Sequence, residues 1–373
     1  MALKVLHLID SGGLYGAEHM LLDLAAAQLD AGLQPVILSA GTPDINEKPL
    51  EVAARARELP LQTFRMRAGL NFRKGMEVLR FAQHQGFDIL HSHGYKFNVL
   101  LGFLPWRVRK LPLLSTVHGY VQASLLSKMW LNRQIYNFSL AWMDAVVCVS
   151  EATRKDAGIF GRQAFVINNG IGLEEHSSAD DPSGHIDAGV DLQDDEFVIA
   201  AFGRLSNEKG FHDLVAAFER VAPELKGTRL IVWGEGSMRR ELEQLVANGR
   251  VANRVSLPGY TNQVEDLLSK VHLVVIPSYS EGLPMILLEA MKYRVPVIAS
   301  TVGAMPEVLD FGGCGILVPP GDVDGLSIAI KQVWNDRSTA MARVKRARER
   351  LKSMYSSGVM EAKYRQLYGT LLR

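Results

Sequence analysis

Residues 197–222 read FVIAAFGRLSNEKGFHDLVAAFERVA and predict a strand, a loop and a helix in succession. The first six residues are apolar without a break, which is typical of a strand buried on both faces of a parallel sheet. Glycines at 203 and 210 flank the loop, and an amphipathic helix is expected over residues 209–222. A strand that feeds a helix through a short loop is the repeating unit of doubly wound α/β folds.

The same alternation covers most of the chain. Further strands are expected at residues 4–9, 35–39, 89–91, 113–117, 145–150 and 165–167, and then at 230–233, 255–257, 273–276, 297–299 and 316–318. Further helices are expected at 17–31, 75–85, 126–142, 238–251, 284–292 and 323–335, with a helical tail over 338–373 that breaks near 356–358. A length of 373 residues also suits two domains. The sequence therefore predicts two Rossmann-like, doubly wound α/β domains.

A polar stretch separates the two sets of elements. Residues 177–196 read SSADDPSGHIDAGVDLQDDE, an acidic segment almost free of large apolar side chains, as is typical of an exposed linker. We therefore expect an N-terminal domain over residues 1–176, a linker over 177–196 and a C-terminal domain over 197–356. Ligands of such sheets bind beyond the carboxyl ends of the strands, so motifs that follow a strand are the candidates for function.

Composition narrows the class of protein. Lys and Arg number 41 against 40 Asp and Glu, a balance without the basic excess that is typical of nucleic-acid-binding proteins. Cys148 and Cys314 lie in apolar contexts and are expected to be buried free thiols, which fits a reducing compartment. The N-terminus lacks the pattern of a signal peptide, and no apolar run reaches the ~18 residues that a membrane span needs. We therefore expect a cytoplasmic protein.

Two glycine-flanked loops are candidates for binding phosphate. In the loop after residue 202, Arg204 and Lys209 leave a strand end and meet the start of a helix, where cations and free backbone amides favour a diphosphate. The alternative is a pair of solvated surface charges. An earlier cluster, SGGLYG at residues 11–16, also lies between a strand and a helix. Its spacing differs from that of dinucleotide-binding loops, and a tight turn is the alternative.

A third segment, PSYSEGLPMILLEA at residues 277–290, carries two carboxylates. Pro284 suits the first position of a helix, which places Glu281 on the loop and Glu289 nearly two turns into the helix. Free amides near residues 282–285 are then expected to face the same side as Glu281. One carboxylate can hold sugar hydroxyls and the other a ribose. The alternative is an acidic group that interacts with the helix dipole.

With these motifs in this order, the sequence resembles the family 4 retaining glycosyltransferases (glycosyl transferases group 1) over almost its whole length. The matching segments are SGGLYGAE (11–18), His118-Gly119, Val149-Ser150-Glu151, Asn169-Gly170-Ile171, FGRLSNEKG (202–210), Gly234-Glu235-Gly236 and EGLPMILLE (281–289). The last three, in this order and spacing, are highly specific. The resemblance implies the GT-B fold, in which two Rossmann-like domains face each other across a cleft. It also implies that the last helix, about 357–373, packs back on the N-terminal domain.

The resemblance implies a role for each matching residue. Arg204 and Lys209 are expected to bind the donor diphosphate and to stabilise the leaving group. Glu281 is expected to contact the transferred sugar, Glu289 the ribose, and His118 to lie beside the anomeric carbon. The other expected donor-binding residues are Gly13, Glu235, Gly282, Leu283 and Pro284, and the acceptor side of the cleft carries Tyr15, Glu18 and His93. The expected catalytic residues are thus His118, Glu281, Arg204 and Lys209.

The implied reaction transfers a sugar, with retention and without a bound metal, from a nucleoside diphosphate sugar that in most of the family is a UDP-sugar. The acceptor is a glycan, a lipid-linked molecule or a small molecule in the synthesis of cell-surface polysaccharide or glycoconjugates. No cofactor besides this co-substrate and no nucleic-acid partner are expected. A UDP-sugar 2-epimerase of the same fold and a non-catalytic nucleotide-sugar-binding protein are the alternatives.

Two patterns have the residue types of metal sites but simpler explanations. Asp322 and Asp324 fit the Asp-x-Asp pattern of metal-dependent glycosyltransferases, yet Asp322 opens a predicted helix and suits its N-cap. His91 and His93 stand at strand spacing, but two histidines leave a zinc site short of ligands. We therefore expect a polar strand end that lines the cleft, and no metal.

One segment bears on the acceptor. Residues 100–114 (LLGFLPWRVRKLPLL) mix apolar side chains with Trp106, Arg107, Arg109 and Lys110. The expected next helix adds Leu125, Leu126, Met129 and Trp130. Such a face can sit on an anionic membrane, and family members that use lipid-linked acceptors place a similar surface on this domain. Core packing with solvated basic residues is the alternative, so peripheral contact with the inner face of the cell membrane stays open.

Overall fold

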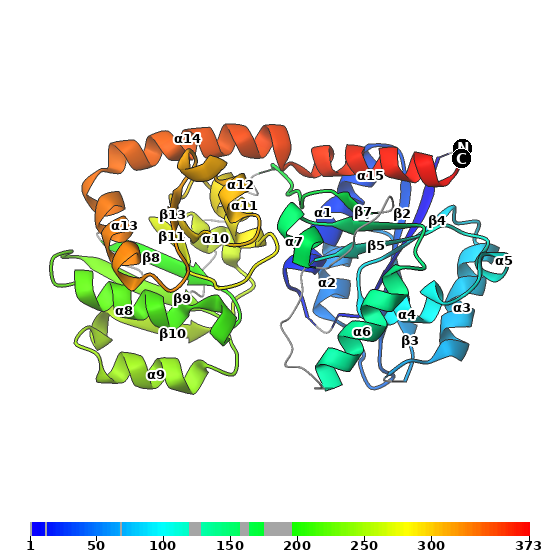
Figure 1. Ribbon diagram of the computed structural model, residues 1–373, viewed down its shortest axis with the longest axis horizontal. Coiled ribbons are helices and arrows are strands. Elements are labelled where there is room, and N and C mark those ends of the chain that lie inside the picture. Colours follow the sequence, from blue (N-terminus) through cyan, green and yellow to red (C-terminus); the bar gives the residue numbers. More distant parts are fainter. Residues whose placement is uncertain (1, 12, 68, 119–127, 157–163, 175–195) are drawn as a thin grey trace. The chain divides into compact units, whose positions relative to one another are not determined.

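The computed structural model describes residues 2–11, 13–67, 69–118, 128–156, 164–174 and 196–373 (Figure 1). The chain divides into two compact units. Unit 1 consists of Met1–Gly172 together with Tyr355–Arg373, and unit 2 consists of Leu173–Met354. Each unit is built around one parallel sheet.

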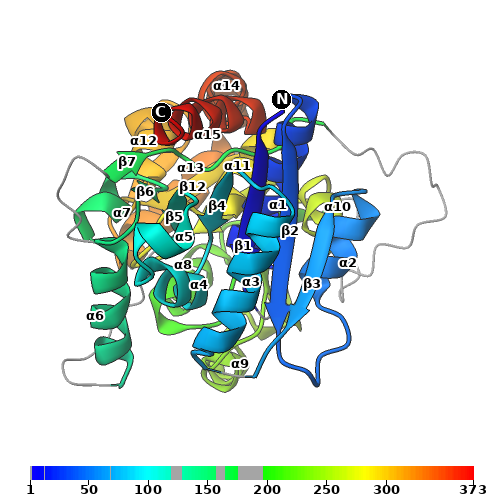
Figure 2. The same cartoon turned by 90° about the vertical axis from the view of Figure 1, so that its right-hand side faces the viewer.

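The sheet of unit 1 has the strand order β3-β2-β1-β4-β5-β6-β7 (Figure 2). Its strands are β1 (Lys4–Ile9), β2 (Gln34–Gly41), β3 (Leu61–Arg65), β4 (Ile89–Ser92), β5 (Leu113–Val117), β6 (Ala145–Cys148) and β7 (Ala164–Val166). Its helices are α1 (Gly16–Asp30), α2 (Pro49–Ala56), α3 (Phe72–His84), α4 (Tyr95–Gly102), α5 (Trp106–Arg109), α6 (Lys128–Leu140), α7 (Glu151–Asp156) and α15 (Ser357–Leu371). Alternate side chains of β1 enter different apolar clusters, because Leu6 and Leu8 pack in one and Ile9 in another. The sheet is therefore covered on both faces.

The sheet of unit 2 has the order β10-β9-β8-β11-β12-β13. Its strands are β8 (Phe197–Phe202), β9 (Thr228–Trp233), β10 (Val255–Gly259), β11 (Leu273–Ile276), β12 (Val297–Ser300) and β13 (Ile316–Val318). Its α-helices are α8 (Phe211–Val221), α9 (Arg239–Asn248), α10 (Val264–Leu268), α11 (Met285–Lys292), α12 (Met305–Val308), α13 (Val323–Asn335) and α14 (Arg337–Met354). Short 3-10 helices are η2 (Asn207–Lys209), η3 (Ala252–Arg254) and η4 (Asp310–Gly312). The predicted α/β fold with two doubly wound sheets is confirmed.

The strand order reverses between β1 and β4 in unit 1 and between β8 and β11 in unit 2. In a doubly wound sheet, the connections on either side of such a switch point leave in opposite directions and open a crevice beyond the carboxyl ends of the strands. The flanking loops are residues 10–15 and 93–94 in unit 1, and residues 203–210 and 277–284 in unit 2. These loops carry most of the residues that the sequence singled out.

Some elements differ from the prediction. Strand β3 and helices α2, α4, α5, α7, α10 and α12 were not predicted, and α8 begins at Phe211 rather than at residue 209. The reason for the late start is Gly210, which has φ +64° and separates the 3-10 helix η2 from α8. Lys209 therefore lies in η2, before the helix begins.

Helix α15 belongs to unit 1 although α14, which precedes it in the chain, belongs to unit 2. The N–H of Ile171 donates to the carbonyl of Tyr355 at 3.0 Å, and Ser357 N–H donates to the carbonyl of Ile171 at 2.9 Å. A Cβ atom on Gly170 would lie 2.4 Å from the carbonyl oxygen of Ser356, so only glycine fits beside this crossing. The start of α15 is thereby tied to the end of the first segment of unit 1.

The predicted linker lies outside the described residues except for Glu196. Cys148 and Cys314 are buried free thiols, as predicted. Among the described residues, no helix is both long and apolar enough to cross a membrane.

Candidate functional site

The loop after β8 closely approaches the loop after β11. Gly210 lies at the contact, where a Cβ atom would stand 2.2 Å from the carbonyl oxygen of Pro277. The N–H of Tyr279 donates to the carbonyl of Glu208 at 2.8 Å. The Tyr279 hydroxyl donates to Asp213 at the start of α8 at 2.5 Å, and this hydrogen bond raises the pKa of the phenol to about 12. The two loops are therefore fixed to each other through their backbones and through one side-chain hydrogen bond.

This arrangement places Lys209 beside Glu281. The Nζ of Lys209 lies 2.6 Å from Oε1 of Glu281, and the hydroxyl of Ser278 donates to the same oxygen at 2.8 Å. Both partners of the ion pair are largely buried, with 23% and 11% of their side chains exposed. Arg204, on the same loop as Lys209, is exposed. The pKa of the neighbouring Glu208 is lowered, against the effect of burial, by a hydrogen bond from Ser206 and by the charges of Arg204 and Lys209. One ion pair thus lies at the switch point of unit 2, with a second cation on the same loop.

Helix α11 begins immediately after this carboxylate. Pro284 is the N-cap with ψ 129°, so the helix starts at Met285, one residue later than expected. Leu283 and Pro284 are buried, whereas Glu281 and Gly282 are partly exposed. Glu289 is the fifth residue of α11, little more than one turn in, and is also partly exposed. The free amides of the first turn therefore follow Glu281 directly along the chain.

The loop after β9 also contacts the loop after β8 in unit 2. A Cβ atom on Gly234 would lie 1.8 Å from the carbonyl oxygen of Gly203, so glycine is required where these loops meet. The N–H of Leu205 donates to the carbonyl of Glu235 at 2.9 Å. The carboxylate of Glu235 pairs with Arg239 at 2.5 Å and is mostly exposed. Glu235 therefore holds the loop through its backbone, while its side chain pairs with Arg239 at the start of α9.

In unit 1, the loop after β1 is shaped by Tyr15. A Cβ atom on Gly13 would stand 2.4 Å from the Tyr15 ring, so a larger residue there would have to displace the ring. The Tyr15 ring is 57% exposed. Glu18 is buried, and its carboxylate accepts a hydrogen bond from the Tyr15 N–H at 2.8 Å. Glu18 thus caps helix α1 and sets the course of the loop, a structural role that the sequence did not suggest.

Two histidines follow neighbouring strands of this sheet. His93 comes after β4 and His118 after β5, and their ring centroids lie 5.8 Å apart. Burial lowers the pKa of His118 to about 4 and that of His93 well below its usual value. Among the described residues, neither ring nitrogen of His118 has a hydrogen-bond partner, nor has Nδ1 of His93. Both imidazoles are therefore neutral, and both have unused hydrogen-bonding capacity at the switch-point edge.

His7 also belongs to this group of histidines, although it was not among the residues predicted from the sequence. In the β1–β4 register His7 lies opposite His91, so His7, His91 and His93 come within 4.8 Å of one another through their ring nitrogens. This spacing suits a metal, but other side chains already occupy both nitrogens of His7 and His91 and Nε2 of His93. The cluster is therefore a hydrogen-bonded one. A histidine in the middle of the apolar strand KVLHLI was the available signal.

Comparisons with known proteins agree with this geometry. The sequence profile described as Glycosyltransferase Family 4 matches residues 15–175, and the profile described as Glycosyl transferases group 1 matches residues 185–350. Together the two profiles span both units. The chain is a family 4 glycosyltransferase.

Relatives of this glycosyltransferase include the N-acetyl-alpha-D-glucosaminyl L-malate synthase of Bacillus anthracis, 27% identical over 80% of this chain and 78% of the relative. The lipopolysaccharide core biosynthesis glycosyltransferase LpsE of Rhizobium meliloti is 25% identical over 94% of this chain and 95% of its own length. The structure of Anabaena HepE in complex with UDP-glucose matches with a TM-score of 0.81 at 20% identity, covering 98% of this chain and 99% of HepE. The likeness to solved structures shows the GT-B fold.

The Asp-x-Asp sequence of the glycosyltransferase has the simpler role that was predicted. Asp322 is the N-cap of α13, and its carboxylate accepts a hydrogen bond from the Gly325 N–H at 2.8 Å. Asp324 forms an ion pair with Arg220. The two carboxylates thus have separate structural partners.

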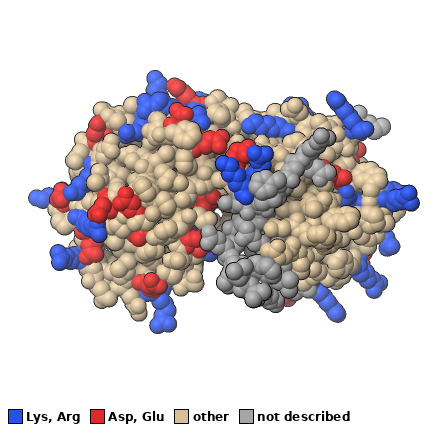
Figure 3. Space-filling model, viewed as in Figure 1, with Lys and Arg blue, Asp and Glu red and all other residues tan. Residues whose placement is uncertain are grey.

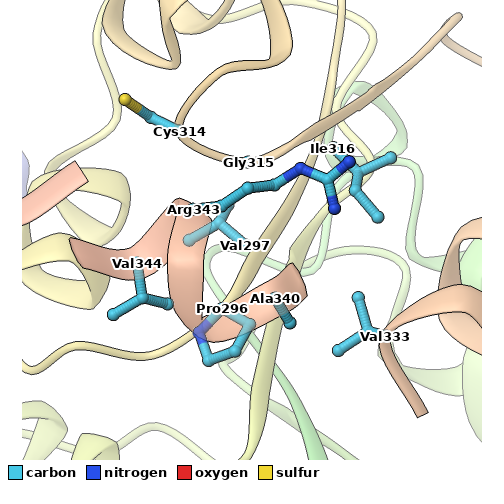
Figure 4. Close-up of a pocket in the computed structure, with 9 residues that line it drawn as sticks. All are labelled: Pro296, Val297, Cys314, Gly315, Ile316, Val333, Ala340, Arg343 and Val344. Carbon is cyan, nitrogen blue, oxygen red and sulfur yellow. The ribbon is translucent and has the colours of Figure 1, made fainter. Parts of the chain in front are cut away.

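An apolar pocket of unit 2 lies away from these loops (Figure 4). Its lining includes Pro296 and Val297 at the start of β12 and Gly315 and Ile316 at the start of β13. The amino ends of parallel strands lie at the edge opposite the carboxyl ends, where the glycosyltransferase carries its candidate residues. On the face drawn in Figure 3, basic and acidic side chains of unit 2 are interspersed.

Proposed function

We propose that this glycosyltransferase transfers a sugar from a UDP-sugar, with retention and without a bound metal, to a hydroxyl group of a glycan, lipid-linked or small-molecule acceptor. Unit 2 holds the donor and unit 1 the acceptor. The product belongs to a cell-surface polysaccharide or another glycoconjugate, and the enzyme works in the cytoplasm.

The observation that carries this proposal is the arrangement of Arg204, Lys209 and Glu281 before helix α11. A diphosphate needs positive charge and amide donors, which the two cations and the first turn of α11 supply. During transfer the departing diphosphate gains negative charge, and preorganised cations stabilise that charge in the transition state. Glu281 supplies a hydrogen-bond acceptor for sugar hydroxyls, and Glu289 for the ribose. The UDP and UDP-glucose bound in the HepE structures support the choice of uridine nucleotide.

Two other functions fit the same group of residues. A UDP-sugar 2-epimerase would convert its substrate without an acceptor, and a non-catalytic binding protein would leave the nucleotide sugar unchanged. We favour transfer because both the family profiles and the curated relatives are those of glycosyltransferases.

The experiment is a thermal-shift screen with UDP, GDP, ADP and their common sugars, followed by product analysis with the best ligand. A ligand that binds only the folded state raises the melting temperature, and at equal concentration the tighter ligand raises it more. We expect UDP and one UDP-sugar to give the largest shifts. Transfer releases UDP and gives a product with the anomeric configuration of the donor. An isomerised UDP-sugar, an inverted product or a preference for GDP would contradict the proposal.

We also propose peripheral contact with an anionic membrane through unit 1. The rings of Trp106, Phe138 and Trp142 are more than half exposed, and Phe138 lies 6.4 Å from Trp142 by ring centroids. Arg107 and Lys110 are exposed beside Trp106. Exposed aromatic rings next to basic side chains are typical of surfaces that bind at the membrane interface.

Three of the residues that suggested this surface take no part in it or lie outside the described residues. Arg109 is buried and pairs with Asp144, and Leu125 and Leu126 lie outside the described residues. Flotation with vesicles that contain anionic lipid tests the contact. The double variant Trp106→Ser/Trp142→Ser should reduce binding, whereas Phe311→Ser, which removes an exposed ring of unit 2, should not. Equal binding of both variants would contradict the proposal.

A further inference from the structure

A chain of hydrogen bonds runs through the buried core of unit 1. The Nε2 of His7 lies 2.8 Å from Oε1 of Gln28 on α1, and Gln28 Nε2 donates to the hydroxyl of Tyr368 on α15 at 3.3 Å. An amide oxygen can only accept, so His7 donates through Nε2. Burial lowers the pKa of His7 to about 4, which keeps the ring neutral with one N–H. The Nδ1 of His7 is therefore an acceptor.

The direction of the next bond follows from this tautomer. Nδ1 of His7 lies 3.0 Å from Nε2 of His93, so His93 is the donor. The His93 ring is 6% exposed and, like His7, is neutral. A neutral imidazole has only one N–H, which this bond uses. Nδ1 of His93 therefore carries a lone pair and no proton.

The series continues beyond Gln28. The hydroxyl of Tyr368 accepts from Gln28 and lies 2.7 Å from Nδ1 of His91, and Nε2 of His91 lies 2.7 Å from the hydroxyl of Thr116. A hydroxyl can accept two hydrogen bonds and donate one, so the bond from Gln28 does not set the direction of the bonds to His91. Each donor from His93 to Tyr368 is fixed by the bond beside it. Hydrogen bonds in such a series polarise and strengthen one another.

The first atom of the series has no partner of its own. Nδ1 of His93 is buried and unpartnered among the described residues, directly beyond the carboxyl end of β4 and beside His118. A buried acceptor without a donor costs free energy, so such an atom in a folded protein needs an explanation. A lone pair at a switch point can accept a hydrogen bond from a ligand that binds there.

We propose that His7, Gln28 and Tyr368 are positioning residues that hold His93 as its Nε2–H tautomer, so that Nδ1 accepts a hydrogen bond from a hydroxyl group of a bound saccharide. The identity of the ligand rests on the proposed function, because a saccharide offers hydroxyl donors. The hydroxyl belongs either to the acceptor or to the transferred sugar, and the experiment below separates these sources.

Nitrogen NMR of the full chain with labelled histidine tests the series directly. We expect His7 and His93 to carry their proton on Nε2 at pH 7. The matched pair is Tyr368→Phe and Tyr364→Phe, since both remove one hydroxyl from a buried tyrosine of α15 and keep its ring. The hydroxyl of Tyr364 lies 2.8 Å from the hydroxyl of Thr116, at the far end of the series from His93. Mixed tautomers of His7 and His93 are expected in Tyr368→Phe alone, and a proton on Nδ1 of wild-type His93 overturns the proposal.

The role of Nδ1 is tested with His93→Gln. The glutamine amide replaces Nε2–H and retains the bond to His7, but it has no acceptor at the position of Nδ1. We expect unchanged affinity for UDP and a roughly tenfold loss of transfer, as for one lost hydrogen bond. Weaker binding of the UDP-sugar identifies the transferred sugar as the source of the hydroxyl, and unchanged binding with slower transfer identifies the acceptor. Full activity of His93→Gln would show that the histidine is only structural.

The two proposals fail in different ways. If the protein binds no nucleotide sugar, the proposed function is refuted. If His93 carries its proton on Nδ1, the positioning series is refuted, whatever the substrate.

Discussion

Lys209 and Glu281 form an ion pair at 2.6 Å although 72 residues separate them, because the loops after β8 and β11 meet at the switch point of unit 2. The carboxylate offsets part of the charge that a diphosphate would use. If Glu281 holds the sugar and Lys209 the diphosphate, as proposed, donor affinity and sugar positioning are coupled through this one contact.

The two carboxylates of this segment should respond differently to substitution. Glu281→Gln removes a negative charge beside Lys209, so UDP should bind as tightly as before or more tightly. Transfer should fall at least ~100-fold, because positioning of the sugar counts most near the transition state. Glu289→Ala should weaken UDP and the UDP-sugar alike, since both contain the ribose. Calorimetry and initial rates check this, and weaker UDP binding in Glu281→Gln would refute the assignment.

The cations should carry donor affinity. Lys209→Ala and Arg204→Ala should each lose about 1.5–3 kcal/mol of UDP binding, the range for hydrogen bonds to charged groups. Arg220→Ala is the control, because Arg220 pairs with Asp324 on the helix that follows β13. Calorimetry with UDP measures all three. Equal affinities of the three variants would contradict the assignment of a phosphate site to this loop.

Activity should not depend on a divalent metal. Asparagine caps helices as well as aspartate does, so Asp322→Asn with Asp324→Asn should leave the fold and the turnover nearly unchanged. Transfer should also survive an excess of chelator. Initial rates with and without EDTA and added Mg²⁺ or Mn²⁺ are the measurement. A strict metal requirement would show that the two cations do not suffice.

Gly210 should matter without touching any ligand. Gly210→Ala adds a Cβ atom 2.2 Å from the carbonyl of Pro277 at a positive φ, and should cost about 2–5 kcal/mol of folding free energy. Gly312→Ala has a positive φ and nothing within 4 Å, so it should cost only about 1–2 kcal/mol. Denaturant unfolding separates the two. We also expect weaker UDP binding in Gly210→Ala alone, because the loop that carries Lys209 is displaced.

Stability should fall as the pH drops below about 6.5. Burial lowers the pKa of His7 and His118 to about 4, so between these values the unfolded chain binds protons that the folded chain does not. The free energy of unfolding therefore decreases by about 1.4 kcal/mol per pH unit for each such histidine. Unfolding curves from pH 8 to pH 4.5 measure this slope. His118→Asn should reduce this slope by about 1.4 kcal/mol per pH unit, the contribution of one proton.

The sequence predicted most buried strands and the loops that follow them, because continuous apolar runs such as LVVI mark both. Strand β3 was missed since it is an edge strand in which Gln62, Thr63 and Arg65 are only partly buried, so its pattern resembles a loop. The ion pair of Lys209 with Glu281 follows from the order of the strands, because β8 lies beside β11 in the sheet. The motifs that follow these two strands suggest that order. The series from His93 to Thr116 could not be predicted, because it needs the β1–β4 register and a helix that returns from the far end of the chain.

The division of the chain has a consequence for synthesis on the ribosome. Unit 2 is continuous in sequence, but the core of unit 1 includes Tyr364 and Tyr368, which are translated after all of unit 2. Until those residues emerge, His91 lacks the Tyr368 hydroxyl beside it and α1 lacks the helix that packs against it. Unit 2 can therefore fold first although it is encoded second, and chaperones that hold nascent chains would have unit 1 as their client.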